Sequence, residues 1–343
     1  MRFLRRLFLL VVILGLAAVA VGFWGRQRLT TPYRGFVDAE VFVEFPSGTS
    51  VAAIADRLVA AGVIPDPWTF RISARLSGAD RRLQAGEYRF AGATSPNDVI
   101  ARLSAGDVYN HPVTFPEGLT IAEMGEIFGR SGLGTPKDFV RAASDASLVA
   151  ALDPDARSLE GYLFPATYSL PRRSGADAAV RAMVIGFDHA FDSGLRAATS
   201  AEGLTPREML TLASIIEKET ARAEERPLVA AVYRNRLRIG MPLQCDPTVI
   251  YALMRAGRWD GNLRRVDLEM NSPYNTYRVR GLPPGPIASP GRASMDAAVH
   301  PADVPYLYFV SRNDGSHVFA KTLSEHNRNV QMYQGRGRRT SPK

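Results

Sequence analysis

The hydrophobic pattern of this chain begins with one uninterrupted apolar run near the N-terminus. Leu7–Trp24 carries no charge and approaches the length that spans a bilayer as a helix. Arginines precede the run, and Trp24 ends it as an interfacial aromatic residue. A cleaved signal peptide is the competing interpretation, but the run is long for one and no small-x-small cleavage site follows it. We therefore expect residues 1–25 to be an uncleaved signal anchor, with the N-terminus in the cytoplasm.

Shorter strand and helix patterns follow a polar stalk. The alternating run Val41–Phe45 predicts a strand, and the apolar positions after it recur at helical spacing as far as Gly62. A similar strand, glycine turn and helix restart at Val108, which indicates two copies of one unit. The arrangement resembles LysM-like modules, which are associated with glycan binding. An unrelated α+β spacer explains the pattern equally well.

Aromatic, proline and glycine motifs become dense from Leu159 onward. A T-x-x-E capping box at Thr205, with proline in the first turn, predicts the start of a helix that ends near Arg222. The loop Gly281–Gly291 contains too many prolines and glycines for regular structure, and a hairpin is expected across Asn313–Gly315. The fold class is therefore α+β. Its predicted parts are a membrane anchor (1–25), a stalk (26–40), a LysM-like region of two units (41–150), a mixed α+β domain (151–334) and a basic tail (335–343).

Composition changes this picture little. The chain has 343 residues with ordinary apolar and charged fractions, so a folded protein is expected. The net charge of +8 comes largely from arginines near the apolar run and in the tail, without a basic helix or an aromatic-basic sheet motif, so no nucleic-acid partner is expected. Cys245 is the single cysteine, which forbids an internal disulfide and fits an exported protein with a large core. The five histidines show no close ligand spacing, so we expect no metal and no other cofactor.

Two carboxylates, Glu217 and Glu219, stand at the end of the apolar helix. On a helical wheel they are about 160° apart, on opposite flanks of the apolar stripe, so they cannot act as a close pair. Desolvation beside an apolar wall raises a carboxyl pKa, as a general acid requires. Periodicity does not choose between the two residues. Two solvated glutamates near a helix terminus are the commoner explanation of such a pair.

Polar and aromatic side chains gather in the segments that follow this helix. Clefts for polysaccharides use aromatic faces for sugar rings and amide or hydroxyl groups for sugar substituents, and the loop Ser272–Tyr277 supplies both kinds. A turn with core tyrosines explains this loop equally well. The candidates for a sugar-lining surface are Asn235, Gln244, Asp246, Tyr274, Asn275 and Tyr277.

Five long blocks of sequence occur in a characteristic order. They are LEGYLFPATY (Leu159–Tyr168), ASIIEKET (Ala213–Thr220), RNRLRIGMPLQCDPTVIYAL (Arg234–Leu253), YNTYRVRGLPPGPIASPG (Tyr274–Gly291) and HPADVPYLYFV (His300–Val310). These blocks resemble the endolytic murein transglycosylases, the MltG/YceG-like family. The anchor and the LysM-like region match as well, so the resemblance covers nearly the whole chain. Cys245 departs from the family, which more usually has threonine there, and this change affects nothing central.

The resemblance implies a lyase that cuts nascent glycan strands of peptidoglycan internally, between N-acetylmuramic acid and N-acetylglucosamine. It assigns the catalytic acid to Glu217, the first glutamate of EKET. One carboxyl group suffices for such chemistry, because the muramyl C6 hydroxyl takes the place of water and closes a 1,6-anhydro ring. Glu160 and Tyr162 join the substrate-binding candidates through their matching block.

The resemblance also implies a location and partners. It predicts a single-pass protein of the bacterial inner membrane, with its catalytic domain on the periplasmic face, working beside wall synthases. Two alternatives stay open. One is a lysozyme-type muramidase that uses Asp246 as a second carboxylate. The other is a non-catalytic glycan-binding scaffold of wall synthesis.

Overall fold

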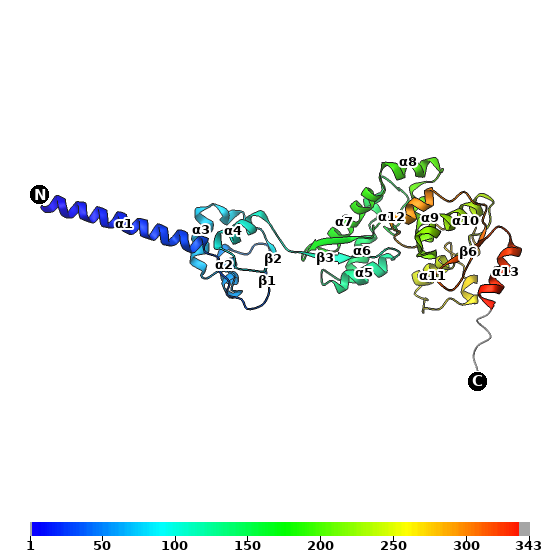
Figure 1. Ribbon diagram of the computed structural model, residues 1–343, viewed down its shortest axis with the longest axis horizontal. Helices are drawn as coiled ribbons and strands as arrows, with labels where there is room; N and C mark the ends of the chain where they lie inside the picture. Colours follow the sequence, from blue (N-terminus) through cyan, green and yellow to red (C-terminus); the bar gives the residue numbers. More distant parts are fainter. Residues whose placement is uncertain (1, 336–343) are drawn as a thin grey trace, which may run out of the picture. The chain divides into compact units, whose positions relative to one another are not determined.

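The computed structural model describes residues 2–335, with side chains from Arg5 onward, and the chain separates into two compact units (Figure 1). Unit 1 runs to His111 and includes 169–173, and unit 2 consists of 112–168 and the described residues from Ser174. The chain mixes helices with small two-stranded sheets. The predicted α+β fold class is therefore confirmed. Apart from Gly335, the predicted basic tail lies outside the described residues.

Helix α1 (Arg2–Thr30) contains the apolar run that the sequence predicts as an anchor. Its segment Arg5–Thr30 is long and apolar enough to cross a membrane, and none of its most apolar window is buried by the protein. A core helix of a soluble protein would bury such a surface. The helix continues past residue 25, so the first five residues of the predicted stalk are helical.

The rest of unit 1 has the order strand, helix, helix, strand, helix. Its elements are β1 (Val41–Phe45), α2 (Val51–Ala60), α3 (Pro67–Leu76), the short 3-10 helix η1 (Ala79–Arg81), β2 (Gly86–Phe90) and α4 (Pro96–Ala105). Strands β1 and β2 are antiparallel, with Val43 opposite Tyr88. Ser50, Asp66 and Ser95 cap the three helices with side-chain oxygens, which is why these helices begin where they do. Aromatic and aliphatic side chains from both strands and all three helices form one core.

The chain then repeats the order strand, helix, helix, strand. The elements are β3 (Asn110–Thr114), α5 (Ile121–Arg130), α6 (Pro136–Ala143), η2 (Ala146–Val149) and β4 (Thr167–Pro171), and β3 and β4 are neighbours in one sheet. The same element order therefore occurs twice, whereas the assignment of the two copies to LysM-like units stays a prediction. The structural division falls at His111 rather than at 150, so α5 and α6 belong to unit 2.

Helix α9 (Pro206–Glu219) forms the centre of unit 2. The capping box at Thr205 is present, and every residue from Met209 to Ile216 is buried. Helix α9 packs against α12 and α10. The other elements are α7 (Gly175–Ala190), α8 (Ser193–Ala201), η3 (Ala223–Glu225), α10 (Arg226–Arg238), α11 (Asp246–Arg255), η4 (Arg265–Glu269), α12 (Arg292–Val299), the antiparallel strands β5 (Tyr308–Ser311) and β6 (His317–Ala320), and α13 (Leu323–Tyr333). The strands β5 and β6 are the hairpin that the sequence predicts.

Candidate active site

Glu217 lies in the last turn of α9, and its carboxylate meets groups from two other elements. Its Oε2 atom accepts a hydrogen bond of 3.1 Å from the Gly291 backbone N–H, and its Oε1 atom lies 3.8 Å from Arg226 Nη2. Gly291 is the N-cap residue of α12, so the positive end of that helix also faces the carboxylate. The Glu217 side chain is only 8% exposed. The backbone donor and the guanidinium compensate for the water that burial removes.

A second carboxylate, Glu117, reaches the same place from the loop after β3. A Cβ atom added to Gly291 would overlap Glu117 Oε1, so this carboxylate rests against the glycine that donates to Glu217. Burial and the nearby charge of Glu217 raise the pKa of Glu117, whereas Arg226 lowers it. Glu117 is nevertheless exposed. Both carboxylates therefore lie beside Gly291 and within the influence of the Arg226 charge, and Glu117 lies on the solvent side.

Three hydrogen bonds hold the turn that carries Glu117. The Gly118 N–H donates to Ser289 O and the Ser289 N–H donates to Leu119 O, both at 2.8 Å, and Lys218 Nζ donates to Gly118 O at 2.9 Å. Gly118 has a φ of +75°, a backbone conformation that favours glycine. This turn, the end of α9 and the start of α12 therefore converge at one point.

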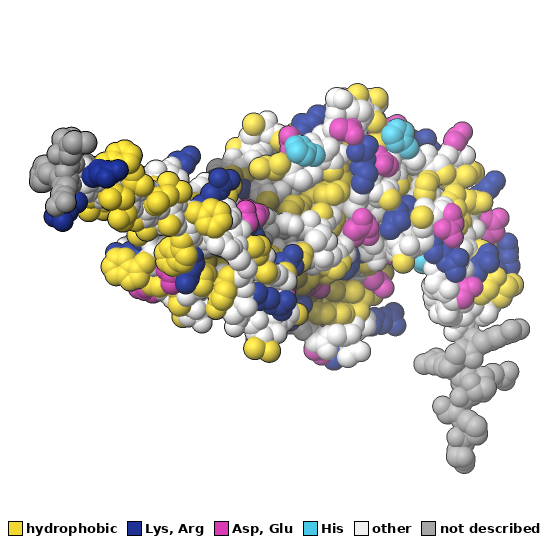
Figure 2. All heavy atoms as spheres, turned by 60° about the vertical axis from the view of Figure 1, so that its left-hand side comes forward, with side chains coloured by type: hydrophobic (Ala, Val, Ile, Leu, Met, Phe, Trp, Pro, Cys, Tyr) yellow, Lys and Arg dark blue, Asp and Glu magenta, His cyan; other side chains and the backbone are white. Residues whose placement is uncertain are grey.

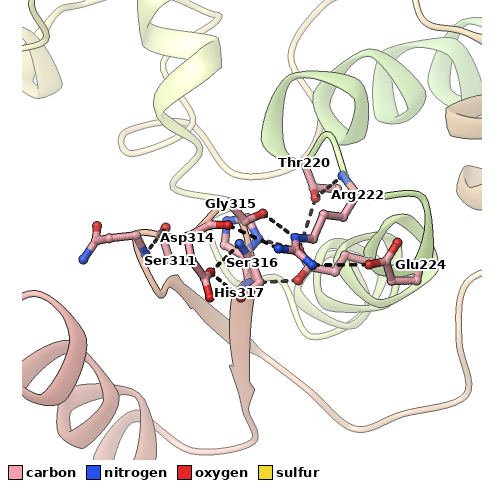
Figure 3. Close-up of polar contacts among 10 residues, drawn as sticks. Thr220, Arg222, Glu224, Ser311, Asp314, Gly315, Ser316 and His317 are labelled. Carbon is pink, nitrogen blue, oxygen red and sulfur yellow. Dashed lines mark hydrogen bonds and ion pairs between the residues drawn. The ribbon is translucent and has the colours of Figure 1, made fainter.

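The segment between α9 and α10 is tied to the tip of the β5–β6 hairpin (Figure 3). Arg222 Nε donates to Gly315 O at 3.0 Å. Glu225 accepts a hydrogen bond from the backbone N–H of His317 at 2.8 Å, and its other oxygen lies 2.6 Å from the ring Nδ1 of the same residue. Arg226 follows directly, so these contacts fix the start of the helix that supplies the cationic partner of the α9 carboxylate.

Glu219 faces a different environment. Its Oε1 atom accepts hydrogen bonds from Tyr233 Oη at 2.6 Å and from Cys245 Sγ at 3.0 Å. Burial raises the pKa of Glu219, and these two hydrogen bonds offset part of that rise. The two α9 carboxylates have different partners, as the helical wheel predicts.

Three sugar-lining candidates lie around the start of α11. Tyr277 Oη donates to Asp246 Oδ1 at 2.6 Å. Gln244 has a φ of +51°, which is uncommon for a residue with a side chain, and its N–H donates to Thr276 O at 3.1 Å. Gln244 and Asp246 are exposed and Tyr277 is half-buried, so all three can contact a ligand.

Tyr274 and Glu160 belong to one cluster around Tyr251. The rings of Tyr251 and Tyr274 lie 5.0 Å apart, and the Arg255 guanidinium lies 5.2 Å from the Tyr274 ring. Glu160 accepts hydrogen bonds from the Ile121 N–H at 3.0 Å and from Tyr251 Oη at 3.1 Å. Burial raises the pKa of Glu160 to about 7, so this carboxyl titrates near neutrality.

Two of the substrate-binding candidates are wrong. Asn275 has no exposed surface, and its amide group holds the backbone of its own loop: Nδ2 donates to Leu268 O and Met270 O, and Oδ1 accepts from the Tyr277 N–H. Tyr162 is buried and donates its hydroxyl to Asp153 at 2.6 Å. Both side chains stabilise the fold and neither can line a sugar cleft, because all their polar atoms are satisfied inside the protein.

Asn235 lies at another part of unit 2. It lines a cavity of about 870 Å³ between the first turn of α9, helix α10 and the loops 281–283 and 301–305. Its Nδ2 atom donates to Val304 O at 2.8 Å and to Tyr306 O at 3.0 Å. Glu217 is not among the residues that line this cavity. Asn235 is therefore separate from the converging loops at the end of α9.

Neither Glu117 nor Arg226 stands out in the sequence. A proline–glutamate–glycine run before a helix indicates a turn, but it does not reveal which residue the turn faces. Arg226 is one of many arginines. Within the described part of the chain, no group of three or more histidine, cysteine, aspartate or glutamate side chains is arranged to hold a metal ion.

Similarity to known proteins covers both units. The model of the YceG-like family matches residues 43–332. The chain belongs to the YceG-like family. It is 34% identical over 324 residues to the endolytic murein transglycosylase of Bacillus subtilis (strain 168), which is 90% of this chain and 88% of that relative. It is 31% identical over 323 residues to a protein of the same name from Streptococcus pneumoniae serotype 2 (strain D39), covering 84% of this chain and 58% of that relative.

A solved structure agrees with this membership. The crystal structure of a yceG-like protein from Listeria monocytogenes superimposes with a TM-score of 0.58 at 32% identity, covering 84% of this chain and 98% of that one. The resemblance seen in the sequence blocks is confirmed for the YceG-like family.

Proposed function

We propose that this protein is an endolytic murein transglycosylase, a lyase that cleaves peptidoglycan glycan strands and forms 1,6-anhydro ends. The observation that carries the proposal is the 34% identity, over 90% of the chain, to a relative of that name. The environment of Glu217 supports it. One nearly buried carboxyl group, held by a backbone N–H and an arginine, suits a reaction that needs a single acid and base.

Glu217 acts first as the acid. It donates its proton to the glycosidic oxygen that leaves C1 of the muramyl residue, and the C1–oxygen bond breaks. The resulting carboxylate then accepts the proton of the C6 hydroxyl, whose oxygen forms a bond to C1 and closes the anhydro ring. Glu217 regains its proton, and water is neither consumed nor released. Arg226 and the Gly291 N–H stabilise the carboxylate between the two steps.

Glu117 lies beside this centre on the solvent side, where it can contact the bound strand. Gln244, Asp246, Tyr274 and Tyr277 supply the amide, carboxylate and aromatic groups that contact sugar rings and their substituents. Glu160 orients Tyr251, on which Tyr274 packs, and so acts on this surface indirectly.

Helix α1 anchors the protein in the bacterial inner membrane as a single span. Its arginine-flanked start lies in the cytoplasm, and everything after Trp24 lies on the periplasmic face. The exposed apolar surface of α1 supports this placement. The anchor keeps the enzyme close to newly made strands, and membrane-bound wall synthases are the expected neighbours.

Mass spectrometry of the fragments released from purified glycan strands tests the reaction. The full chain should yield anhydro-muramyl ends, which are one water lighter than hydrolysed ends. Fragments with hydrolysed ends would identify a muramidase and point to Asp246 as a second carboxylate. Binding of strands without any fragments, by a folded protein, would identify a non-catalytic scaffold.

A further inference from the structure

Helix α3 presents apolar side chains on two opposite faces. Phe70 and Ala74 point into the core of unit 1 and are completely buried. Trp68, Ile72 and Leu76 are 65%, 56% and 82% exposed. Their spacing of four residues places them on one stripe along the whole helix. Single exposed apolar residues are ordinary on a protein surface, but a continuous stripe on a core helix is typical of an interaction site.

Arginines accompany this stripe. Arg71 and Arg75 are exposed on the same helix, and the Arg71 guanidinium lies 4.9 Å from the Trp68 ring. Arg81 and Arg82 follow and are also exposed. A helix face that combines tryptophan and aliphatic residues with arginine is typical of segments lying in a membrane–water interface. The aliphatic part of arginine packs on the apolar surface while its charged end reaches the lipid phosphates.

Two carboxylates lie near this face, and one of them is already engaged. Asp66 caps α3 by accepting from the Thr69 N–H at 2.8 Å, and it also pairs with Arg28. Asp80 lies beyond the C-terminal end of α3. The exposed arginines therefore outnumber the acidic groups, which favours an anionic partner.

The end of α1 places α3 at the level of the membrane surface. Arg28 Nη1 lies 3.5 Å from Asp66 Oδ2, and the Arg28 guanidinium lies 5.0 Å from the Trp24 ring. Trp24 ends the apolar run of α1, and tryptophans at such ends lie at the lipid headgroups. Helix α3 thus begins about one helical turn of α1 beyond Trp24. Figure 2 shows hydrophobic side chains on α1 and on the adjoining part of unit 1, with arginines among them.

We propose that the stripe Trp68, Ile72 and Leu76, with Arg71 and Arg75, binds the surface of an anionic phospholipid bilayer beside α1. The proposal rests on the membrane anchoring by α1 and is independent of the transglycosylase reaction. The bilayer is favoured over a protein partner because α3 begins beside Arg28, at the end of the candidate span, and because arginines accompany the stripe. Two attachments, α1 and the stripe, then fix the orientation of unit 1 on the membrane.

The three tryptophans of the full chain, at positions 24, 68 and 259, provide the test. Variants that keep only Trp24 or only Trp68, with phenylalanine at the other two positions, are reconstituted into phosphatidylcholine–phosphatidylglycerol bilayers. Lipids brominated in their acyl chains quench tryptophans that contact the bilayer. A matched control carries Phe42→Trp as its single tryptophan, on β1 at the side of unit 1 away from α1 (Figure 1).

We expect quenching of Trp68 comparable to that of Trp24, and none of the tryptophan at position 42. Quenching of Trp24 without Trp68 would overturn the proposal while leaving the anchor intact, and would assign the stripe to water or to a protein. Absence of quenching at both positions would overturn the anchor and the proposal together. Equal quenching of the tryptophan at position 42 would also overturn the proposal, because contact would then not be specific to the stripe.

Two further measurements separate the apolar and charged parts. Replacing both Ile72 and Leu76 by glutamine in the Trp68-only protein should abolish its quenching, and the same changes in the Trp24-only protein should leave its quenching unchanged. Pure phosphatidylcholine should weaken the quenching of Trp68. Persistence of the full Trp68 signal in the glutamine variant, or in pure phosphatidylcholine, would contradict the proposed contact with an anionic bilayer. None of these readouts depends on glycan cleavage.

Discussion

The two sides of the last turn of α9 hold carboxylates with opposite surroundings. Glu217 is held by a backbone N–H at a helix start and by a guanidinium, with a second carboxylate on its solvent side. Glu219, two residues later, is held by a tyrosine hydroxyl and a thiol. Charged and backbone donors stabilise a carboxylate that must gain and lose a proton during a reaction. Neutral donors in a buried pocket suit an acid that ties helices together.

The difference comes from what other segments supply and not from α9 itself. Both residues lie beside the same apolar stripe, and helical periodicity alone does not distinguish them. The start of α12, the start of α10 and the turn at Gly118 meet on the Glu217 side. Helix α10 and the residue before α11 meet on the Glu219 side. The comparison therefore predicts that one substitution abolishes activity and that the other affects mainly stability.

Replacing Glu217 by glutamine should have the largest effect. Loss of a general acid and base should lower the cleavage rate by roughly 10²–10⁴-fold, while the amide preserves size and the protein stays folded. Fragment release from purified strands, followed by mass spectrometry, measures the rate. Glu219→Gln is the matched control and should retain most of the activity. The opposite result would exchange the roles of the two residues.

Glu160 extends the comparison to pH, because burial raises its pKa and no cationic side chain donates a hydrogen bond to it. Its pKa is about 7 in the folded protein and near 4.5 in the unfolded protein. Below pH 4.5 the carboxyl group is therefore protonated in both states, and its burial does not oppose folding through ionisation. Stability should fall as pH rises from there through 7, by on the order of 2–3 kcal/mol, because the folded state resists ionisation. In Glu160→Gln the fall in melting temperature between pH 5 and 8 should be smaller. Parallel curves for the two proteins would show that Glu160 does not titrate in this range.

Substitutions in the pocket around Glu219 should lower the stability of the protein. Glu219→Leu leaves the Tyr233 hydroxyl and the Cys245 thiol without their acceptor, which should lower the free energy of unfolding by about 1–3 kcal/mol. Cys245→Ser keeps a donor of similar size and should cost less. Urea unfolding followed by circular dichroism measures both. An unchanged midpoint for Glu219→Leu would mean that its hydrogen bonds contribute nothing to folding.

Local signals in the sequence were sufficient for the parts of the fold that depend on neighbouring residues. The start of α9 follows from Thr205 and Glu208, and the β5–β6 hairpin follows from its turn. Exposure is not local, and the two wrong candidates show why. Asn275 and Tyr162 have the side chains that sugars favour, yet the fold uses both internally. Glu117 was missed for the same reason, because its neighbour Gly291 lies far along the chain.

Gly291 allows the contribution of Glu117 to be separated from that of Glu217. A methyl group at this position would overlap Glu117 Oε1, and only the flexible end of that side chain has to move. The φ of Gly291 is −77°, so alanine fits the backbone and the N–H to Glu217 is retained. Gly291→Ala should therefore lower the cleavage rate roughly tenfold, a barrier change of about 1.4 kcal/mol, with little change in melting temperature.

Glu117→Ala is the matched variant, and adding Gly291→Ala to it should lower the rate no further, because the displaced group is already absent. Independent losses from the two changes would instead show that the methyl group disturbs Glu217 directly. A Gly291→Ala enzyme with the full rate would mean that Glu117 can leave its position without consequence. The activity of Glu217 would then depend on Arg226 and the start of α12 alone. Glu117 would not contribute to the difference between the surroundings of Glu217 and those of Glu219.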